Sequence, residues 1–127
     1  MPKRILVVDD EKEILNLVSE LLSHEGYEVA IASSGAEADE AIQRQIPDLV
    51  ILDVSLPGED GISICGRLKS GTATMSIPII LMTAKYDSRE DAKKGLNAGA
   101  DEYVVKPFLN RIMLANVKHL LGELRHT

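Results

Sequence analysis

The sequence has little of several residue types that mark particular classes of protein. It contains one cysteine, Cys65, no tryptophan and one phenylalanine among its 127 residues. A single cysteine cannot form an internal disulfide, so a small fold held together by disulfide bonds is excluded. The apolar spacing around Cys65 predicts a small core residue there rather than a nucleophile.

Long apolar runs and an excess of basic residues are also lacking. No apolar stretch approaches the ~20 residues of a membrane-spanning helix, and residues 1–4 lead directly into a predicted strand instead of a signal-peptide core. Lys and Arg number 14 against 20 Asp and Glu, which gives a net charge of −6. Nucleic acids and anionic membranes require clustered basic side chains. We therefore expect a cytoplasmic protein with neither as a direct partner.

The sequence does contain a regular alternation of apolar runs and amphipathic segments. Its length and its 45% hydrophobic content suit one domain with a buried core, which we take as residues 1–127. Five short segments are typical of strands, at residues 5–8, 27–32, 49–52, 77–83 and 102–106. The first, third and fourth are apolar and belong inside a sheet, whereas the second and fifth are mixed and belong at its edges.

Each predicted strand is followed by a segment with the apolar spacing of an amphipathic helix. These helices are expected at residues 11–25, 34–45, around 62–68, 87–99 and along 113–124. Residues suited to helix ends stand at the boundaries: Gly26 and Gly99 at C-termini, and Ser34, Glu37, Asp87 and Glu90 at N-termini. The residues expected to face inward from the last two helices are Ala92, Leu96, Met113, Val117, Leu120, Leu121 and Leu124.

Strands that alternate with helices predict an α/β fold with a doubly wound five-stranded parallel sheet and five helices. With right-handed crossovers, the expected edge strands give the flavodoxin-like order 2-1-3-4-5. In such a sheet, ligands bind beyond the carboxyl ends of the strands, where the chain reverses direction between strands one and three. Asp9 and Asp10 follow strand one, and Asp53 ends strand three, so we expect these carboxylates to meet in one cleft.

Three carboxylates in one cleft repel each other strongly unless a cation is present. Mg²⁺ suits this set best because it prefers one or two carboxylates with waters and phosphate oxygens, and the spaced acids of an EF-hand are absent from the sequence. The fourth strand adds the hydroxyl of Thr83, and the fifth adds Lys106, a point charge suited to phosphate. Together these groups favour phosphoryl transfer, in which Asp53 attacks in line and becomes an acyl phosphate.

Each of these residues taken alone has an ordinary structural explanation. An aspartate after a strand is commonly a helix cap, Thr83 alone would end a strand, and Lys106 alone would be a solvated lysine before a turn. All five acidic, hydroxyl and lysine residues, however, stand at carboxyl ends of strands that the predicted order brings together, which favours a shared functional site.

Short motifs at the strand ends carry a resemblance to a known family. They are Asp9-Asp10, Asp53 followed by Pro57-Gly58, Thr83-Ala84, and Lys106-Pro107-Phe108. In type and spacing they resemble the response-regulator receiver domain of two-component signalling, of the chemotaxis-regulator type, over essentially the whole chain. The resemblance implies a phosphorelay signalling protein. It would be a phosphoacceptor that takes part in its own phosphorylation and dephosphorylation, rather than an enzyme with a separate substrate.

The resemblance also implies a role for each site residue. Asp53 would be the phosphoacceptor, charged by the phosphohistidine of a sensor histidine kinase or a histidine phosphotransfer protein. Mg²⁺ would be held by Asp10, Asp53 and the main-chain carbonyl of Ser55, with Asp9 assisting. Thr83 would bond the phosphoryl group and Lys106 would pair with it. Thr83 and the aromatic residue Tyr103 would form the switch.

Output would pass to a downstream protein target or to an effector domain. By the same resemblance, Ser55 and Lys85 flank the approach of the hydrolytic water. Receivers of DNA-binding regulators usually carry a glutamate and an arginine that pair across a dimer, and this chain has Ile112 and Asn116 at those places. That departure leaves the oligomeric state open.

Other functions are compatible with the predicted fold. A flavodoxin-like electron carrier would need a hydroxyl- and glycine-rich phosphate loop after strand one, where Asp9, Asp10 and Glu11 would repel phosphate. A phosphatase with an aspartate nucleophile would carry an Asp-x-Asp motif there instead of adjacent aspartates. A receiver-like interaction module that works without phosphorylation stays open as an alternative, although the intact set of acids, hydroxyl and lysine argues against it.

Overall fold

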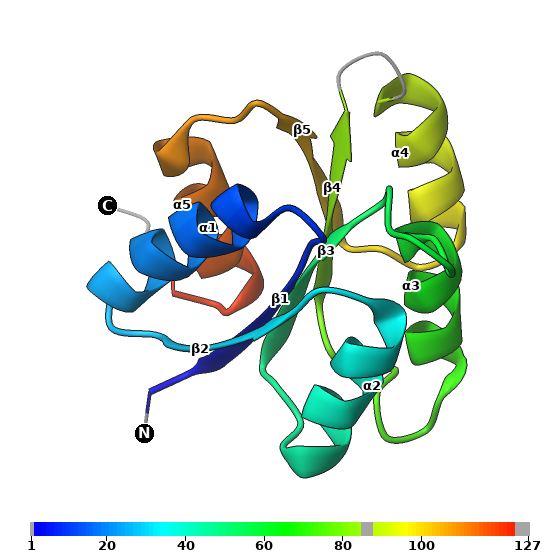
Figure 1. The fold of residues 1–127 in the computed structure, drawn as a ribbon, viewed down its shortest axis with the longest axis horizontal. Coiled ribbons are helices and arrows are strands. Elements are labelled where there is room, and N and C mark those ends of the chain that lie inside the picture. The colour runs from blue at the N-terminus through cyan, green and yellow to red at the C-terminus, as the bar shows by residue number, and fades with distance from the viewer. Residues whose placement is uncertain (1, 85–87, 124–127) are drawn as a thin grey trace.

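A computed structural model describes residues 2–84 and 88–123, which form a five-stranded sheet with helices on both faces (Figure 1). Lys85, Asp87 and Leu124, about which the sequence makes predictions, lie outside these residues. The strands are β1 (Arg4–Val8), β2 (Glu28–Ala32), β3 (Leu49–Asp53), β4 (Ile79–Ala84) and β5 (Glu102–Lys106). The helices are α1 (Lys12–His24), α2 (Gly35–Arg44), α3 (Gly61–Ser70), α4 (Ser88–Asn97) and α5 (Asn110–Leu120).

The strands of the sheet are all parallel and follow the order β2-β1-β3-β4-β5, which confirms the predicted topology. The two strands of mixed composition, β2 and β5, lie at the edges as expected. Helices α1 and α5 cover one face, and α2, α3 and α4 cover the other (Figure 1). From β1 the chain moves to one edge of the sheet at β2 and then returns past β1 to β3. The direction of winding therefore reverses between β1 and β3, whose carboxyl ends lie side by side.

The central strands are buried on both faces, which explains their continuous apolar runs. In β1, Leu6 and Val8 pack into the core shared with α2 and α3, while Ile5 and Val7 pack into the core shared with α1 and α5. Cys65 is fully buried in the first of these cores, as predicted. Burial raises the pKa of its thiol to about 11, so Cys65 is an inert core residue.

Helix α2 begins with the hydrogen bonds that its sequence predicts, with one difference. The Ser34 hydroxyl accepts a hydrogen bond from the Glu37 N–H at 3.2 Å, as in a capping box. The Glu37 carboxylate, however, accepts from the N–H and the hydroxyl of Ser33, at 2.9 and 3.0 Å, instead of from Ser34. At the end of α4, Gly99 has a φ of +104°, the left-handed conformation predicted for the residue that closes this helix.

The prediction that Leu96 faces inward is wrong. Leu96 is 52% exposed, whereas Ala92 on the same helix is buried as expected. The physical reason is the close approach of α4 to β4 at Gly95, where an added Cβ would lie 2.4 Å from Leu81 Cδ1. Successive side chains turn by about 100° around a helix, so the residue after this contact points away from the sheet.

Helix α5 packs with the predicted face toward the sheet. Met113 and Val117 are fully buried, and Leu120 and Leu121 are partly buried against the same core. Asn116 lies away from that core, and its side-chain amide donates to the main-chain carbonyl of Ile112 at 3.1 Å. Among the helices of residues 2–84 and 88–123, none combines the length and the apolar character needed to cross a membrane.

Candidate functional site

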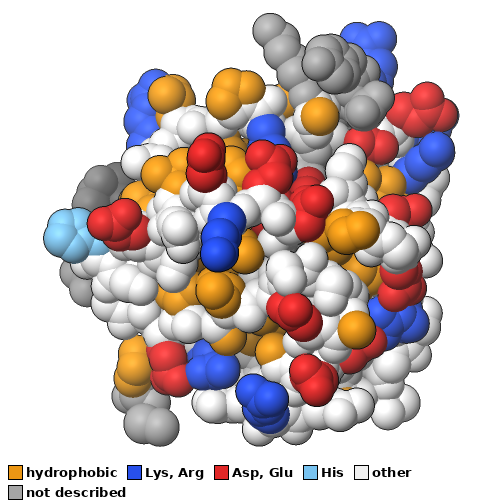
Figure 2. Space-filling model, viewed as in Figure 1, with side chains coloured by type: hydrophobic (Ala, Val, Ile, Leu, Met, Phe, Trp, Pro, Cys, Tyr) orange, Lys and Arg blue, Asp and Glu red, His pale blue; other side chains and the backbone are white. Residues whose placement is uncertain are grey.

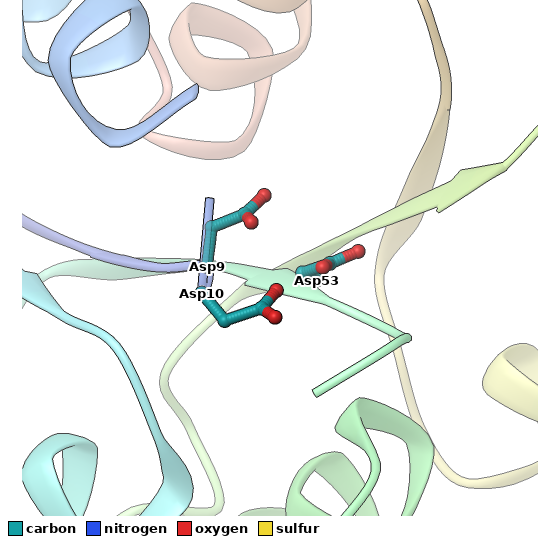
Figure 3. A group of neighbouring side chains, drawn as sticks. All are labelled: Asp9, Asp10 and Asp53. Carbon is teal, nitrogen blue, oxygen red and sulfur yellow. The ribbon is translucent and has the colours of Figure 1, made fainter. Parts of the chain in front are cut away.

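Three carboxylates meet at the carboxyl ends of β1 and β3. Asp9 and Asp10 follow β1, and Asp53 is the last residue of β3. Figure 3 shows the three side chains directed into a common space beyond the ends of the two strands, and one oxygen from each lies within 4.8 Å of the others. Asp9 is 0% exposed and Asp53 is 3% exposed, whereas Asp10 is exposed to solvent. The sequence predicts this grouping, and the sheet order brings it about.

The side chain of Lys106, the last residue of the edge strand β5, extends over the carboxyl end of the sheet to these acids. Its Nζ lies 2.8 Å from Asp9 Oδ2 and 3.2 Å from Asp53 Oδ1. Glu11 Oε1 lies 3.6 Å from the same nitrogen. Figure 2 shows acidic side chains gathered above the ends of β1 and β3 with a basic side chain among them. One lysine thus faces several carboxylates, and the site remains negatively charged.

The pKa values of Asp53 and Lys106 reflect this shortage of positive charge. Burial raises the pKa of Asp53 from 3.8 to about 6, and the nearby charge of Asp9 raises it as well. The charge of Lys106 and hydrogen bonds from Lys106 and from the Ser55 N–H oppose this rise only in part. Burial lowers the pKa of Lys106, but its bond to Asp9 and the Asp53 charge outweigh burial and raise it overall.

The chemistry of this donor set fits a hard divalent cation. The three carboxylates offer oxygen ligands close enough together to share one ion. A bound cation would also relieve the repulsion that a single lysine leaves uncompensated. Within residues 2–84 and 88–123, no other group of three or more acidic, histidine or cysteine side chains lies close enough together to share a metal ion.

The backbone beneath Asp53 is supported by a glycine whose role the sequence does not reveal. The Gly61 N–H donates to the Val54 carbonyl at 2.8 Å. A Cβ on Gly61 would lie 2.1 Å from the main-chain carbonyl oxygen of Asp53. Glycine is a weak helix former, but the first turn of α3 can pack directly against the end of β3 only because this residue has no side chain.

Thr83 lies near the end of β4, next to the strand that carries Asp53. Its side chain is buried, at 1% exposure, and its hydroxyl donates to Asp91 Oδ2 on α4 at 2.8 Å. Sequence reasoning misses Asp91. The neighbouring Glu90 is also an acid in the first turn of α4, and no sequence signal separates the two.

Tyr103, the aromatic residue predicted for a switch, lies in the edge strand β5 beside Leu81 of β4. Thr83 comes two residues after Leu81, so Thr83 and Tyr103 project from the same face of neighbouring strands. Tyr103 is 37% exposed. The structure thus places the two predicted switch residues on adjacent strands, and the ring is accessible to solvent.

Comparison with protein families gives one decisive match. The model of the response regulator receiver domain matches residues 5–118. The chain belongs to the response-regulator receiver family. Receivers of this family are phosphoacceptor modules of two-component signalling that bind Mg²⁺ at an acidic pocket and act together with histidine kinases and effector domains.

Solved receiver structures superpose closely on this receiver. A protein described as a response regulator from Chloroflexus aurantiacus has a TM-score of 0.90 and 37% identity, over 96% of this chain and 99% of that one. A CheY-like receiver domain protein from Methanospirillum hungatei has a TM-score of 0.88 and 35% identity, over 97% and 96%. For NtrX from Brucella abortus, the TM-score is 0.88 with 31% identity, over 96% of this chain but 27% of NtrX.

Proposed function

We propose that this receiver accepts a phosphoryl group on Asp53 from the phosphohistidine of a sensor histidine kinase or a histidine phosphotransfer protein, and that the reaction requires Mg²⁺. The observation that carries the proposal is the placement of the Asp53 carboxylate. It is 3% exposed at the end of β3, groups with Asp9 and Asp10, and lies 3.2 Å from Lys106 Nζ. A buried carboxyl group with charged neighbours of this kind is typical of a functional site.

In this proposal each residue of the site has a defined task. Asp10, Asp53 and the main-chain carbonyl of Ser55 hold Mg²⁺, and Asp9 assists. Bound there, the ion offsets negative charge on the phosphoryl oxygens. An oxygen of Asp53 bonds to phosphorus while the bond between phosphorus and the donor imidazole nitrogen breaks, and the electron pair of that bond stays on the nitrogen. Lys106, already within reach of Asp53, pairs with the transferred group.

The phosphorylated state is then read by a partner at the surface. Thr83 bonds the phosphoryl group, and Tyr103 responds to the movement of Thr83. The surface that we assign to the readout is formed by α4, β5 and α5, and it carries exposed apolar side chains: Tyr103, Leu109 and Ile112. Leu109 is 58% exposed and Ile112 is 45% exposed, so both side chains are open to contact by a partner.

The proposed function is tested with a small phosphodonor. Incubation with acetyl phosphate and Mg²⁺ should add one phosphoryl group to the protein, as seen by intact-mass spectrometry. The adduct should be absent in Asp53→Asn and in the presence of a chelator. Asp39→Asn is the matched control, because Asp39 on α2 makes a surface ion pair with Arg67 on α3 and takes no part in the carboxylate group of the site. An adduct that survives both Asp53→Asn and chelation would overturn the assignment, and no adduct in the wild type would favour the phosphorylation-independent module.

A further inference from the structure

The Thr83 hydroxyl is already engaged with a residue outside the set described for phosphoryl transfer. Its oxygen lies 2.8 Å from Asp91 Oδ2, which is a normal length for a hydroxyl that donates to a carboxylate. The contact with the Ala84 carbonyl is 3.4 Å, which is too long to compete. Asp91 therefore fixes the direction of the Thr83 proton, toward α4.

A hydroxyl has a single proton and can donate it to one acceptor at a time. A phosphoryl oxygen on Asp53 and the Asp91 carboxylate therefore compete for the same donor. Because Thr83 is 1% exposed, water does not provide an alternative hydrogen-bond partner for its hydroxyl.

Asp91 also faces the loop that follows the acceptor. It borders a cavity of about 400 Å³ that is lined as well by Val54 and Ser55, the two residues after Asp53, and by Lys94. A phosphoryl group on Asp53 would add negative charge beside this loop, and so closer to the Asp91 carboxylate. Repulsion between the two would favour the same outcome as the competition for the proton, the release of Asp91.

We propose that Asp91 is a positioning residue that holds the Thr83 hydroxyl toward α4 in the unphosphorylated receiver, so that phosphorylation must break this bond to turn the switch. This inference rests on the proposed function of Asp53. It gives α4 a direct connection to the site, because the residue that loses its hydrogen bond belongs to the first turn of that helix. The bond sets how strongly the receiver resists activation.

The test measures the affinity for beryllofluoride, a mimic of the phosphoryl group, by isothermal titration with excess Mg²⁺. Asp91→Asn should tighten binding by roughly three- to tenfold, because the neutral amide oxygen of asparagine accepts the Thr83 proton more weakly than the carboxylate does. Glu90→Gln is the matched control: it removes the same charge from the same helix turn, and Glu90 pairs with Lys94, at 3.8 Å, instead of with Thr83. It should change the affinity by less than about twofold, as expected for an exposed ion pair.

A double-mutant cycle separates the hydrogen bond from simple charge repulsion. In a Thr83→Val background, Asp91→Asn should have no further effect on the beryllofluoride affinity, because the hydroxyl for which the two groups compete is gone. The inference is overturned if Asp91→Asn fails to tighten binding, if Glu90→Gln tightens it equally, or if the effect persists with Thr83→Val. Failure of the proposed function looks different: beryllofluoride would then bind wild type and Asp53→Asn alike, and this result would overturn both.

Discussion

The Asp53 carboxylate is held where its charge is disfavoured, so its ionisation makes a pH-dependent contribution to stability. In the folded protein its pKa is raised from 3.8 to about 6, first by burial and then by the charge of Asp9. Folding therefore favours the protonated acid. The corresponding stability is fully present below about pH 4 and is lost as the pH rises through about 6.

Replacement of Asp53 by asparagine should remove this loss. The raised pKa of Asp53 corresponds to about 3 kcal/mol of unfolding free energy. In chelator, most of this should appear as an increase of about 2 kcal/mol in the stability of Asp53→Asn relative to wild type between pH 4 and pH 7. Urea denaturation of both proteins at four pH values over this range measures the difference directly. A difference that stays constant would show that Asp53 ionises without penalty.

At the residue scale, sequence reasoning finds the groups that stand at strand ends and misses those that act through the backbone or across the fold. Asp9, Asp10, Asp53, Thr83 and Lys106 are predicted because a parallel sheet gathers the residues that follow its strands. Asp91 is missed because it reaches Thr83 from a helix, and the Ser55 N–H is missed because main-chain donors leave no mark in a sequence.

At the element scale, the first turn of α3 packs directly against the end of β3. Gly61 makes this contact, and an added Cβ would meet the backbone of Asp53. Gly66 is a glycine of the same helix with ordinary space around it, since a Cβ there would lie 3.8 Å from the Ala98 Cβ. The two positions therefore separate the effect of helix propensity from the effect of crowding.

Alanine at the two positions should change stability in opposite directions. Gly66→Ala should raise the unfolding free energy by about 0.5–1 kcal/mol, because alanine is the better helix former. Gly61→Ala should lower it by about 1–3 kcal/mol, the usual cost of overpacking, and should weaken beryllofluoride binding because the backbone of Asp53 must move. Thermal and urea unfolding give both values. Equal effects of the two substitutions would mean that the backbone yields easily at Gly61.

The elements themselves differ in how well the sequence predicts them. Strands β1, β3 and β4 are buried on both faces and are visible as apolar runs with boundaries nearly as observed. Helix α4 is less predictable, because its contact with the sheet is made by Gly95 and Ala92, which contribute almost nothing to an apolar pattern. The apolar signal there comes from Leu96, which is exposed.

At the scale of the whole molecule, the site and the readout surface share the same edge of the sheet. Strand β5 contributes Lys106 to the site and Tyr103 to the surface, and β4 contributes Thr83 between them. A change at the site therefore has a path of adjacent residues to α4, β5 and α5. The sheet order, which the sequence predicts from the composition of the strands and the rule of right-handed crossovers, is what creates this path.

Thr83→Ala should interrupt the path without abolishing the chemistry. With beryllofluoride and Mg²⁺, amide chemical-shift changes around Asp53 should persist in this variant, because the acceptor and its lysine are intact. Changes around Tyr103 and Ile112 should shrink relative to wild type, because the hydroxyl that links site and surface is missing. Two-dimensional NMR of both proteins makes the comparison. Identical changes at the surface in wild type and Thr83→Ala would rule out this route.

The central claim is that Asp53, among three grouped aspartates, is the residue that carries the phosphoryl group. Borohydride reduces an aspartyl phosphate to homoserine, so treatment after phosphorylation marks the acceptor permanently. Peptide mass spectrometry should then find homoserine at position 53 when Mg²⁺ is present, and aspartate there when a chelator is added. Homoserine at Asp9 or Asp10 instead, or at no position after treatment with a phosphodonor and Mg²⁺, would contradict the account.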